Sequence, residues 1–420
     1  MAIRTLVISN SAMNHQDSNG RTILNLVDGI HKDSVAQFFT YGNPDTYFNC
    51  YKVSDFDAKK SFLKHKVING TVPKDKSNGS NQKGVKAKIK KTPFKMLIRE
   101  FVWKHGFWNN VFLEEWIDSF DPQCVLLVLG DNCFLPDLAI SIVKKRRIPL
   151  YIFSTEDYPF KKYNYITKRP SIFYCFFRRK LLNSYKSLEK YVNHAFFNTD
   201  SLRLLYEKQF KFPCSTIYNA TSIDWNNNAK NTKNIRISYL GNLGLGRHKA
   251  LIDIARVLNL IAPGIKLDVY GNIPNDVIKS EMLSCEFINL KGFVDYNKVI
   301  EIIHGSTVVI HAETDDCFYL RDLKYAFSTK IADCVSSGTP LFLYAPHELA
   351  ESIFLIEHKC AFVATSKSDI KETLFNAIYN QKARTKVLQN ALIVRNSIFT
   401  NNNVFAKIAE EMGKNENRSN

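Results

Sequence analysis

The sequence predicts an α/β protein built from two Rossmann-like, doubly wound domains that face a central cleft. Short apolar runs of strand length alternate with helical stripes through the first half of the chain, and this alternation starts again near residue 222. Alternating strands and helices are typical of parallel sheets covered on both faces. The chain also has 420 residues, too many for a single hydrophobic core. Two domains are therefore expected.

The first half supplies alternating strands and helices. Residues 22–30 have apolar side chains at helical spacing, and residues 93–120 form a longer helical segment. Between these two helices, residues 70–92 lack apolar periodicity and are rich in Lys, Gly, Ser and Asn, which predicts a mobile basic loop. A further helix is expected at 135–147. The expected strands are 4–9, 35–41, 124–130, 149–154, 194–199 and 214–220.

The second half repeats this order. Residues 220–234 are polar and are expected to be the linker, after which strand 235–241 leads to helix 249–261. Further strands are expected at 265–271, 286–294, 307–312, 339–345 and 361–365. The expected organisation is an acceptor-side domain over 1–220, a nucleotide-binding domain over 221–395, and a C-terminal helix and tail over 396–420 that returns to the first domain.

Composition excludes several classes of protein. Hydrophobic residues make up 45% of the chain and aromatic residues 13%, as in a folded globular protein. No apolar run approaches the roughly 18 to 20 residues that cross a bilayer, and the first residues lack the features of a secretory signal. Nine cysteines without a C-x-x-C pair indicate reduced thiols in the cytoplasm. No metal site is expected, because metal-ligand spacing is missing around the histidines His15, His194, His304 and His311.

The formal net charge of +17 is concentrated in the first half. Residues 59–104 carry a net charge of +12 and residues 144–190 a net charge of +10. Nucleic acid, anionic lipid headgroups or a polyanionic substrate are the partners for such a basic surface. Residues 83–104 join a lysine-dense run to a helical stripe of apolar residues. This segment is expected either to pack on the domain core or to lie on an anionic membrane.

The segment YLGNLGLGRHK, residues 239–249, places a glycine-rich turn between a strand and a helix. Exposed N–H groups and the helix dipole favour an anion at such a place. The G-x-x-G-x-G spacing differs from the dinucleotide fingerprint, and the next strand ends at Gly271 without the ribose-binding acid; Asp268 lies inside that strand. No G-K-[ST] sequence follows, which argues against a P-loop. An ordinary glycine turn is the alternative, but Arg247 and Lys249 at a helix start favour an anion.

A second cluster lies in residues 327–346. Lys330 and Asp333 are one helical turn apart, just after Ser328 and Thr329, which are typical of a helix start. A cation and a carboxylate at this spacing can form a simple surface ion pair. They can also form one site, with phosphate near Lys330 and a sugar hydroxyl on Asp333.

Residues 235–346 resemble the donor domain of GT-B fold glycosyltransferases, particularly the family-4-like bacterial enzymes that build surface polysaccharides. In that family, the first loop of the second domain and a basic residue after it hold the nucleotide diphosphate, and a later helix carries a carboxylate for the ribose. The resemblance implies that Arg247 and Lys330 stabilise the leaving diphosphate and that Asp333 binds the ribose. The donor-binding residues that it implies are Gly20, Gly241, Asn242, Arg247, Lys249, Gly271, Phe293, Val294, Ser328, Thr329, Lys330 and Asp333.

The sequence departs from the family in its acidic residues. The paired E-x7-E pattern is incomplete, because Tyr325 stands eight residues before Asp333. The hydroxyls of the donor sugar are therefore left either to Glu313 or to Asp315 and Asp316, unless these three form an acidic surface loop.

In the first half, Glu156 and Asp157 end the strand 149–154, where family members carry a His or Asp near the reacting sugar. Asp157, and after it Glu156, are the catalytic candidates that contact the donor sugar or position the acceptor hydroxyl. Asp157 as the cap of the following turn is the alternative. Gly20 resembles the glycine loop that approaches the donor phosphates from the opposite domain.

The resemblance implies a glycosyltransferase that moves a sugar from a UDP- or GDP-sugar to a glycan or lipid-linked acceptor in bacterial surface polysaccharide biosynthesis. Cationic side chains and helix dipoles neutralise the leaving diphosphate, so neither a tightly bound cofactor nor an obligate metal is expected. The expected location is the cytoplasm, peripheral at the inner face of the plasma membrane. The alternatives are an NAD-dependent oxidoreductase and a nucleic-acid-binding protein that uses residues 59–104. The second leaves the cluster at 235–346 without a role, so nucleic acid is not the expected partner.

Overall fold

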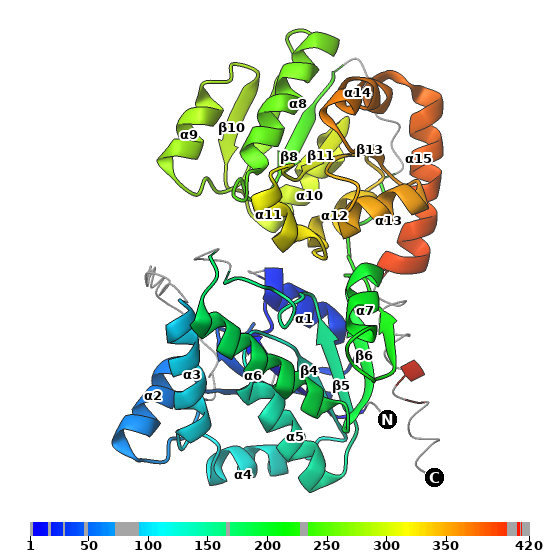
Figure 1. Cartoon of the computed structure of the whole chain (residues 1–420). Helices are drawn as coiled ribbons and strands as arrows, with labels where there is room; N and C mark the ends of the chain where they lie inside the picture. Colours follow the sequence, from blue (N-terminus) through cyan, green and yellow to red (C-terminus); the bar gives the residue numbers. More distant parts are fainter. Residues whose placement is uncertain are drawn as a thin grey trace, which may run out of the picture. The chain divides into compact units, whose positions relative to one another are not determined.

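The computed structural model describes residues 3–15, 18–27, 30–45, 49–71, 92–164, 169–226, 234–400, 410, 411 and 413. The chain divides into two compact units (Figure 1): Met1–Ile217 with Phe405–Asn420, and Tyr218–Val404. The division falls between Ile217 and Tyr218, where the sequence suggests a limit at 220. Residues 72–91 of the expected basic loop and 227–233 of the expected linker lie outside the described residues.

The first unit is built on a parallel seven-stranded sheet in the order β3-β2-β1-β4-β5-β6-β7. Its strands are β1 (Thr5–Ser11), β2 (Val35–Tyr41), β3 (Asn49–Lys52), β4 (Cys124–Val128), β5 (Leu150–Ser154), β6 (Val192–Phe197) and β7 (Cys214–Thr216). The central strands are almost continuously buried, as expected for a sheet covered on both faces. The order reverses direction between β1 and β4, which is where α/β sheets bind ligands.

The helices of the first unit are α1 (Ser18–Val27), α2 (Asp55–Lys64), α3 (Pro93–His105), α4 (Val111–Phe120), α5 (Phe134–Arg146), α6 (Ile172–Leu188) and α7 (Asp200–Glu207), with a 3-10 turn at Lys32–Ser34. The single helix expected at 93–120 is wrong, because the chain turns between α3 and α4. The amide of Gly106 ends α3 on the carbonyl of Val102, and the side chain of Asn110 caps α4 through the amide of Phe112.

The tail also has described residues in the first unit. Glu411 lies with its Oε2 atom 3.2 Å from Nδ1 of His194, which is on β6. None of the helices in the described residues is long and apolar enough to cross a membrane.

The second unit repeats the architecture with a parallel six-stranded sheet in the order β10-β9-β8-β11-β12-β13. Its strands are β8 (Ile237–Leu240), β9 (Leu267–Tyr270), β10 (Ile288–Gly292), β11 (Val308–Ala312), β12 (Leu341–Tyr344) and β13 (Phe362–Ala364). Strand order and direction therefore confirm the prediction of two doubly wound, Rossmann-like units. The order reverses between β8 and β11.

The helices of the second unit are α8 (Arg247–Ile261), α9 (Asp276–Leu283), α10 (Tyr296–Gly305), α11 (Cys317–Leu323), α12 (Thr329–Val335), α13 (Ala350–His358), α14 (Ile370–Tyr379) and α15 (Gln381–Val394), with a 3-10 turn at Lys367–Asp369 and a π turn at Arg395–Phe399. Two separate clusters of buried side chains cover the sheet. One contains Leu251 of α8 and Val269 of β9, and the other contains Ile331 of α12 and Leu341 of β12.

Candidate functional site

The carboxyl ends of β8 and β9 meet through two glycines. The amide of Gly241 donates a hydrogen bond to the carbonyl of Tyr270 at 2.9 Å, and a Cβ atom on Gly271 would lie 1.8 Å from the carbonyl oxygen of Gly241. Only glycine fits at position 271, because the obstacle is backbone. The amide of Gly271 in turn bonds to the carbonyl of Gly292 at the end of β10. At this edge of the sheet, just before Phe293 and Val294, Gly241, Gly271 and Gly292 therefore expose only backbone atoms. A flat or anionic ligand can approach these atoms closely.

The turn after β8 is shaped by local hydrogen bonds. The side-chain oxygen of Asn242 accepts from the amide of Gly244 at 2.7 Å, and the hydroxyl of Tyr239 donates to the carbonyl of Asn242 at 2.9 Å. Gly246 has φ +80°, and a Cβ atom there would lie 2.6 Å from Oγ1 of Thr314. Gly246 is the N-cap residue that precedes α8, and it brings no side chain to cap the helix. The positive end of the 15-residue helix α8 therefore has no side-chain cap, although the amides of Arg247 and Lys249 already donate to the carbonyls of Gly244 and Gly246.

Arg247 is the first residue of α8 and forms a side-on ion pair with Glu313, which follows β11. Its Nε and Nη2 atoms donate to the two carboxylate oxygens at 2.8 and 2.7 Å. The side chain of Arg247 is 16% exposed and that of Glu313 is 3% exposed. This pairing uses two of the five N–H bonds of a guanidinium, so three donors remain for a second anion. Burial opposes both charges, but each partner holds the other ionised: the pKa of Arg247 is raised and that of Glu313 is lowered.

The ion pair continues into the core. The Nε2 atom of His311, on β11, lies 3.6 Å from Oε1 of Glu313 and 3.4 Å from Oε2 of Glu351, on α13. Burial lowers the pKa of His311, but Glu351 and Glu313 outweigh burial and raise it to about 9. Two cations, Arg247 and His311, thus balance two buried carboxylates. In the described residues, His311, Glu313 and Glu351 are also close enough together to hold a metal ion. A metal would have to displace both the proton of His311 and the guanidinium of Arg247, so the donor set fits an ion-pair network better than a metal site.

The network predicts a loss of stability at alkaline pH. The pKa of His311 is raised from 6.5 to about 9, so its charge stabilises the fold fully below about pH 6.5 and less as the pH rises through 9. This shift corresponds to at most about 3 kcal/mol. Thermal unfolding of the wild type should therefore show a decrease in stability between pH 7 and 10. His311→Gln should be less stable at pH 7 but should lack this part of the decrease. Parallel pH profiles for the two proteins would contradict the assignment.

Lys330 and Asp333 both lie on α12, in the connection from β11 to β12. Ile331 of α12 belongs to the same buried cluster as Leu240, the last residue of β8. Asp333 is 6% exposed, and its Oδ1 atom accepts hydrogen bonds from Thr221 at 2.7 Å and Tyr296 at 3.4 Å. Two hydroxyls therefore orient this carboxylate. Lys330, one turn earlier, is half-buried.

The other sequence candidates of this unit differ in exposure. Lys249 is exposed, Phe293 is 72% exposed just after β10, and Val294 is half-buried. Ser328 precedes α12 without a side-chain cap, and Thr329 is its first residue.

The acidic residues after β11 do not form one surface loop. Glu313 is buried against Arg247, and Asp316 caps α11 by accepting from the amide of Phe318 at 2.9 Å. Asp315 is exposed and lies 3.7 Å from the amine of Lys367. Glu313 thus has a partner that the sequence pattern did not reveal.

The first unit holds the remaining candidates. Lys161 lies between the two acids that follow β5, with its amine 2.6 Å from Glu156 and 3.4 Å from Asp157. Asp157 is 7% exposed, and burial raises its pKa although Lys161 lowers it. Its carbonyl accepts from the amide of Phe160, so Asp157 also begins a turn. Gly20 lies in α1, where a Cβ atom would be 2.7 Å from the carbonyl oxygen of Ala12; glycine lets α1 pack against the segment after β1.

Solved structures similar to the whole chain share this two-unit architecture. HepE of Anabaena, in complex with UDP and glucose, is 10% identical with a TM-score of 0.62 and covers 98% of this chain and 99% of its own. The sucrose-phosphate synthase of Thermosynechococcus elongatus is 8% identical with a TM-score of 0.62, and the match covers 99% of this chain and 100% of the synthase chain. The lipopolysaccharide outer core galactosyltransferase WaaB is 11% identical with a TM-score of 0.57, and the match covers 98% of this chain and 99% of the WaaB chain. No protein-family model matches the chain, and no curated protein matches it in sequence. These likenesses show that the chain has the GT-B fold.

Proposed function

We propose that this GT-B fold protein is a glycosyltransferase that moves a sugar from a nucleotide diphosphate donor to a glycan or lipid-linked acceptor. The observation that carries the proposal is the position of Arg247. A guanidinium that is anchored side-on by Glu313, at the start of α8 and beside the Gly241–Gly271 edge, keeps donors for one more anion. A diphosphate fits this arrangement, and the similar HepE structures contain UDP or UDP-glucose.

The donor would lie along the carboxyl edge of the second unit. The diphosphate faces Asn242, Arg247 and the start of α8, with Lys249 and Lys330 as further cations. Asp333 accepts the ribose hydroxyls, and the backbone at Phe293 and Val294 faces the base. Ser328 and Thr329 offer hydroxyl and amide donors at the start of α12. Gly20 of the first unit remains a proposed donor-binding residue, and this role is supported only by its resemblance to the glycine loop of the family.

The chemistry required of these residues is charge stabilisation. As the sugar leaves, negative charge grows on the diphosphate, and Arg247, Lys330 and the α8 terminus stabilise it without reorganising. Glu313 holds Arg247 in place, and the hydroxyls of the donor sugar are left either to Glu313 or to Asp315 and Asp316. Asp157 contacts the donor sugar or positions the acceptor hydroxyl, and Lys161 keeps Glu156 beside it. A UDP- or GDP-sugar is the proposed donor, with no tightly bound cofactor and no obligate metal.

The proposed setting is bacterial surface polysaccharide biosynthesis in the cytoplasm, peripheral at the inner face of the plasma membrane. The glycan or lipid-linked acceptor would approach the basic first unit. Two of the similar structures, HepE and the outer core galactosyltransferase WaaB, agree with a sugar-transfer role.

Calorimetric titration with UDP, GDP, ADP, CMP and NAD tests the proposal. At least one nucleoside diphosphate should bind, and Asp333→Asn should weaken it about tenfold or more, because hydrogen bonds to a charged group contribute about 1.5–3 kcal/mol. Asp268→Asn is the matched control. Asp268 lies inside β9, bonded to Asn289, near the position of a dinucleotide-binding acid.

Three outcomes separate the possibilities. Weaker nucleoside diphosphate binding by Asp333→Asn, together with normal binding by Asp268→Asn, supports the glycosyltransferase proposal. Binding of NAD that depends on Asp268 favours the oxidoreductase alternative. A folded protein that binds none of the five nucleotides overturns the proposal.

A further inference from the structure

Two neighbouring helices of the first unit expose apolar side chains to solvent. Helices α3 and α6 pack against each other (Figure 1), and the rings of Phe94 and Phe173 lie 5.3 Å apart across the contact. The exposed fractions run from 45% at Phe173 to 67% at Ile172. We call the following six residues the α3–α6 surface: Phe94, Ile98, Phe101, Ile172, Phe173 and Phe176. Exposed apolar residues that gather on adjacent elements mark an interaction surface.

Helix α3 explains why these side chains are not core. Its other face carries Met96, Glu100 and Trp103, which are buried in the unit. The apolar residues Phe94, Ile98 and Phe101 therefore form a second stripe, spaced at helical intervals on the outer side. A helix that only packs on the core needs one apolar stripe and not two. The sequence predicts that residues 83–104 either pack on the domain core or lie on a membrane. Helix α3 has one apolar face for each of these roles, so the two do not exclude each other.

The exposed charged residues on α3 and α6 themselves are all cations, whereas Asp55 on the neighbouring helix α2 is 61% exposed and accepts a hydrogen bond from Nε of Arg99 at 2.8 Å. The exposed cations on the two helices are Lys95, Lys104, Arg179 and Lys186. The one acid in the two helices is Glu100, which is 2% exposed and accepts the amide of Cys133. A surface with exposed aromatic residues, cations and no exposed carboxylate on either helix is complementary to an anionic, partly apolar partner.

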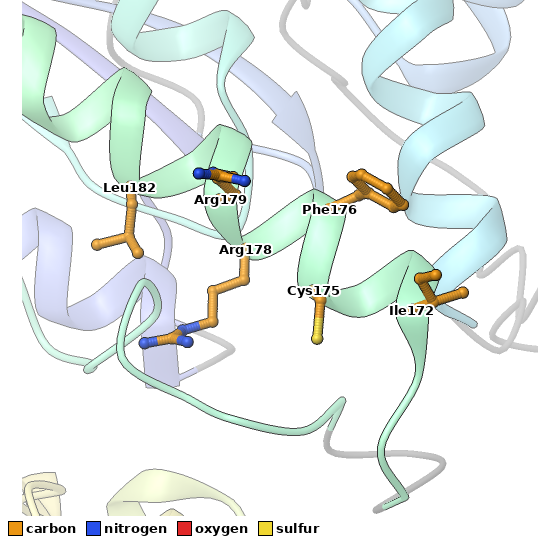
Figure 2. A pocket seen from close by; sticks show the side chains of 6 residues that line it. All are labelled: Ile172, Cys175, Phe176, Arg178, Arg179 and Leu182. Atoms are coloured by element: carbon orange, nitrogen blue, oxygen red, sulfur yellow. The ribbon is translucent and has the colours of Figure 1, made fainter.

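The adjacent side of α6 continues this character. Figure 2 shows a hollow along the helix, of about 320 Å³, lined by Ile172, Cys175, Phe176, Arg178, Arg179 and Leu182. Cys175, Arg178 and Leu182 point to one side of the helix. The Nε atom of Arg178 donates to the carbonyl of Pro159 at 2.9 Å, which holds its guanidinium at the wall of the hollow. Apolar walls with a fixed cation suit a lipid headgroup and the start of its acyl chains.

We propose that the α3–α6 surface docks the protein on an anionic lipid membrane. Each Lys or Arg near such a surface contributes about 1 kcal/mol, and the Phe and Ile side chains gain further by entering the headgroup region. Nucleic acid fits less well, because Ile98 and Ile172 offer neither a stacking face nor a hydrogen bond to a base or phosphate. The role of this docking rests on the proposed function, since docking would hold the first unit beside a lipid-linked acceptor. Vesicle binding itself requires no nucleotide.

Sedimentation with vesicles tests the docking. The full chain should sediment with vesicles of phosphatidylcholine and phosphatidylglycerol, and not with phosphatidylcholine alone. Binding should weaken as salt rises, because charge attraction is screened within about 10 Å at 0.1 M salt. Ile98→Ser/Phe176→Ser and Arg179→Glu/Lys186→Glu should each reduce binding at least tenfold. Both pairs replace exposed side chains, so the fold should persist.

Matched controls lie in the second unit. Leu260→Ser/Val277→Ser removes apolar side chains that are 69% and 67% exposed, and Lys279→Glu/Lys382→Glu reverses two exposed lysines. Both control variants should bind vesicles like the wild type. Nucleotide titration of every variant separates the two proposals, since the α3–α6 variants should keep wild-type nucleotide affinity. No sedimentation at low salt, equal loss in the controls, or tighter retention on random DNA or RNA than on vesicles would overturn membrane docking.

Discussion

Arg247→Ala is expected to lower kcat/KM for sugar transfer by about 100- to 1000-fold. Loss of one preorganised donor to a developing anion costs about that much in other enzymes. Here the guanidinium is 16% exposed and fixed by two hydrogen bonds to Glu313, so solvent replaces it poorly. The measurement is transfer from the donor that the wild type binds. Near wild-type kcat/KM in a folded Arg247→Ala protein would sink the assignment.

The same substitution also removes the partner of a buried charge. Glu313 would keep only His311 nearby, and breaking a buried ion pair costs about 3–5 kcal/mol of stability. Arg247→Leu/Glu313→Leu separates the two effects, because apolar replacement of both partners is often neutral or stabilising. We expect this double variant to unfold close to the wild-type temperature while remaining as inactive as Arg247→Ala. Recovery of transfer in the double variant would mean that Arg247 serves stability alone.

Much of the fold follows from local pattern. Buried parallel strands are apolar runs whatever their neighbours, so β1, β2, β5 and most strands of the second unit fall within a few residues of their expected limits. The strand β3 and the helices α2, α6 and α7 are absent from the expectations. β3 is a four-residue edge strand with only Cys50 and Tyr51 buried, too short for a clear alternation. α2 did carry a signal, the capping box of Ser54 and Asp57.

The candidate site was predictable only where its parts are close in sequence. The glycine turn, Arg247 and the Lys330–Asp333 pair each stand in one short segment with recognisable spacing. The network of Glu313, His311 and Glu351 joins β11 to α13, and it forms because the order β11-β12 brings α13 over the same strand ends. His311 resembles an ordinary core histidine in sequence. The available signal was the two-residue spacing of His311, on β11, and Glu313, just after this strand, which places both side chains on the same side of an extended chain.

Lys330→Met is expected to lower kcat/KM for transfer by about 100- to 1000-fold with little change in thermal stability. Methionine keeps a long apolar side chain and removes only the charge. Lys330 is half-buried near the start of α12, the helix that also carries Asp333. A cation at the start of a helix is unfavourable for the helix dipole, so its removal should not cost helix stability. The positive charge of Lys330 is expected to be favourable only when an anion is bound.

Binding and rate measurements together distinguish this role from a simple ion pair with Asp333. If Lys330 stabilises the leaving diphosphate, kcat should fall more than donor affinity, because the charge on the diphosphate grows during transfer. If Lys330 only orients Asp333, Lys330→Met should weaken nucleotide binding as Asp333→Asn does and leave kcat near the wild-type value. Lys324→Met is the control, since Lys324 is exposed on the same connection and lies 5.7 Å from the ring centre of Tyr325. Equal losses in the two lysine variants would mean that general charge near α12, and not the position of Lys330, sets the rate.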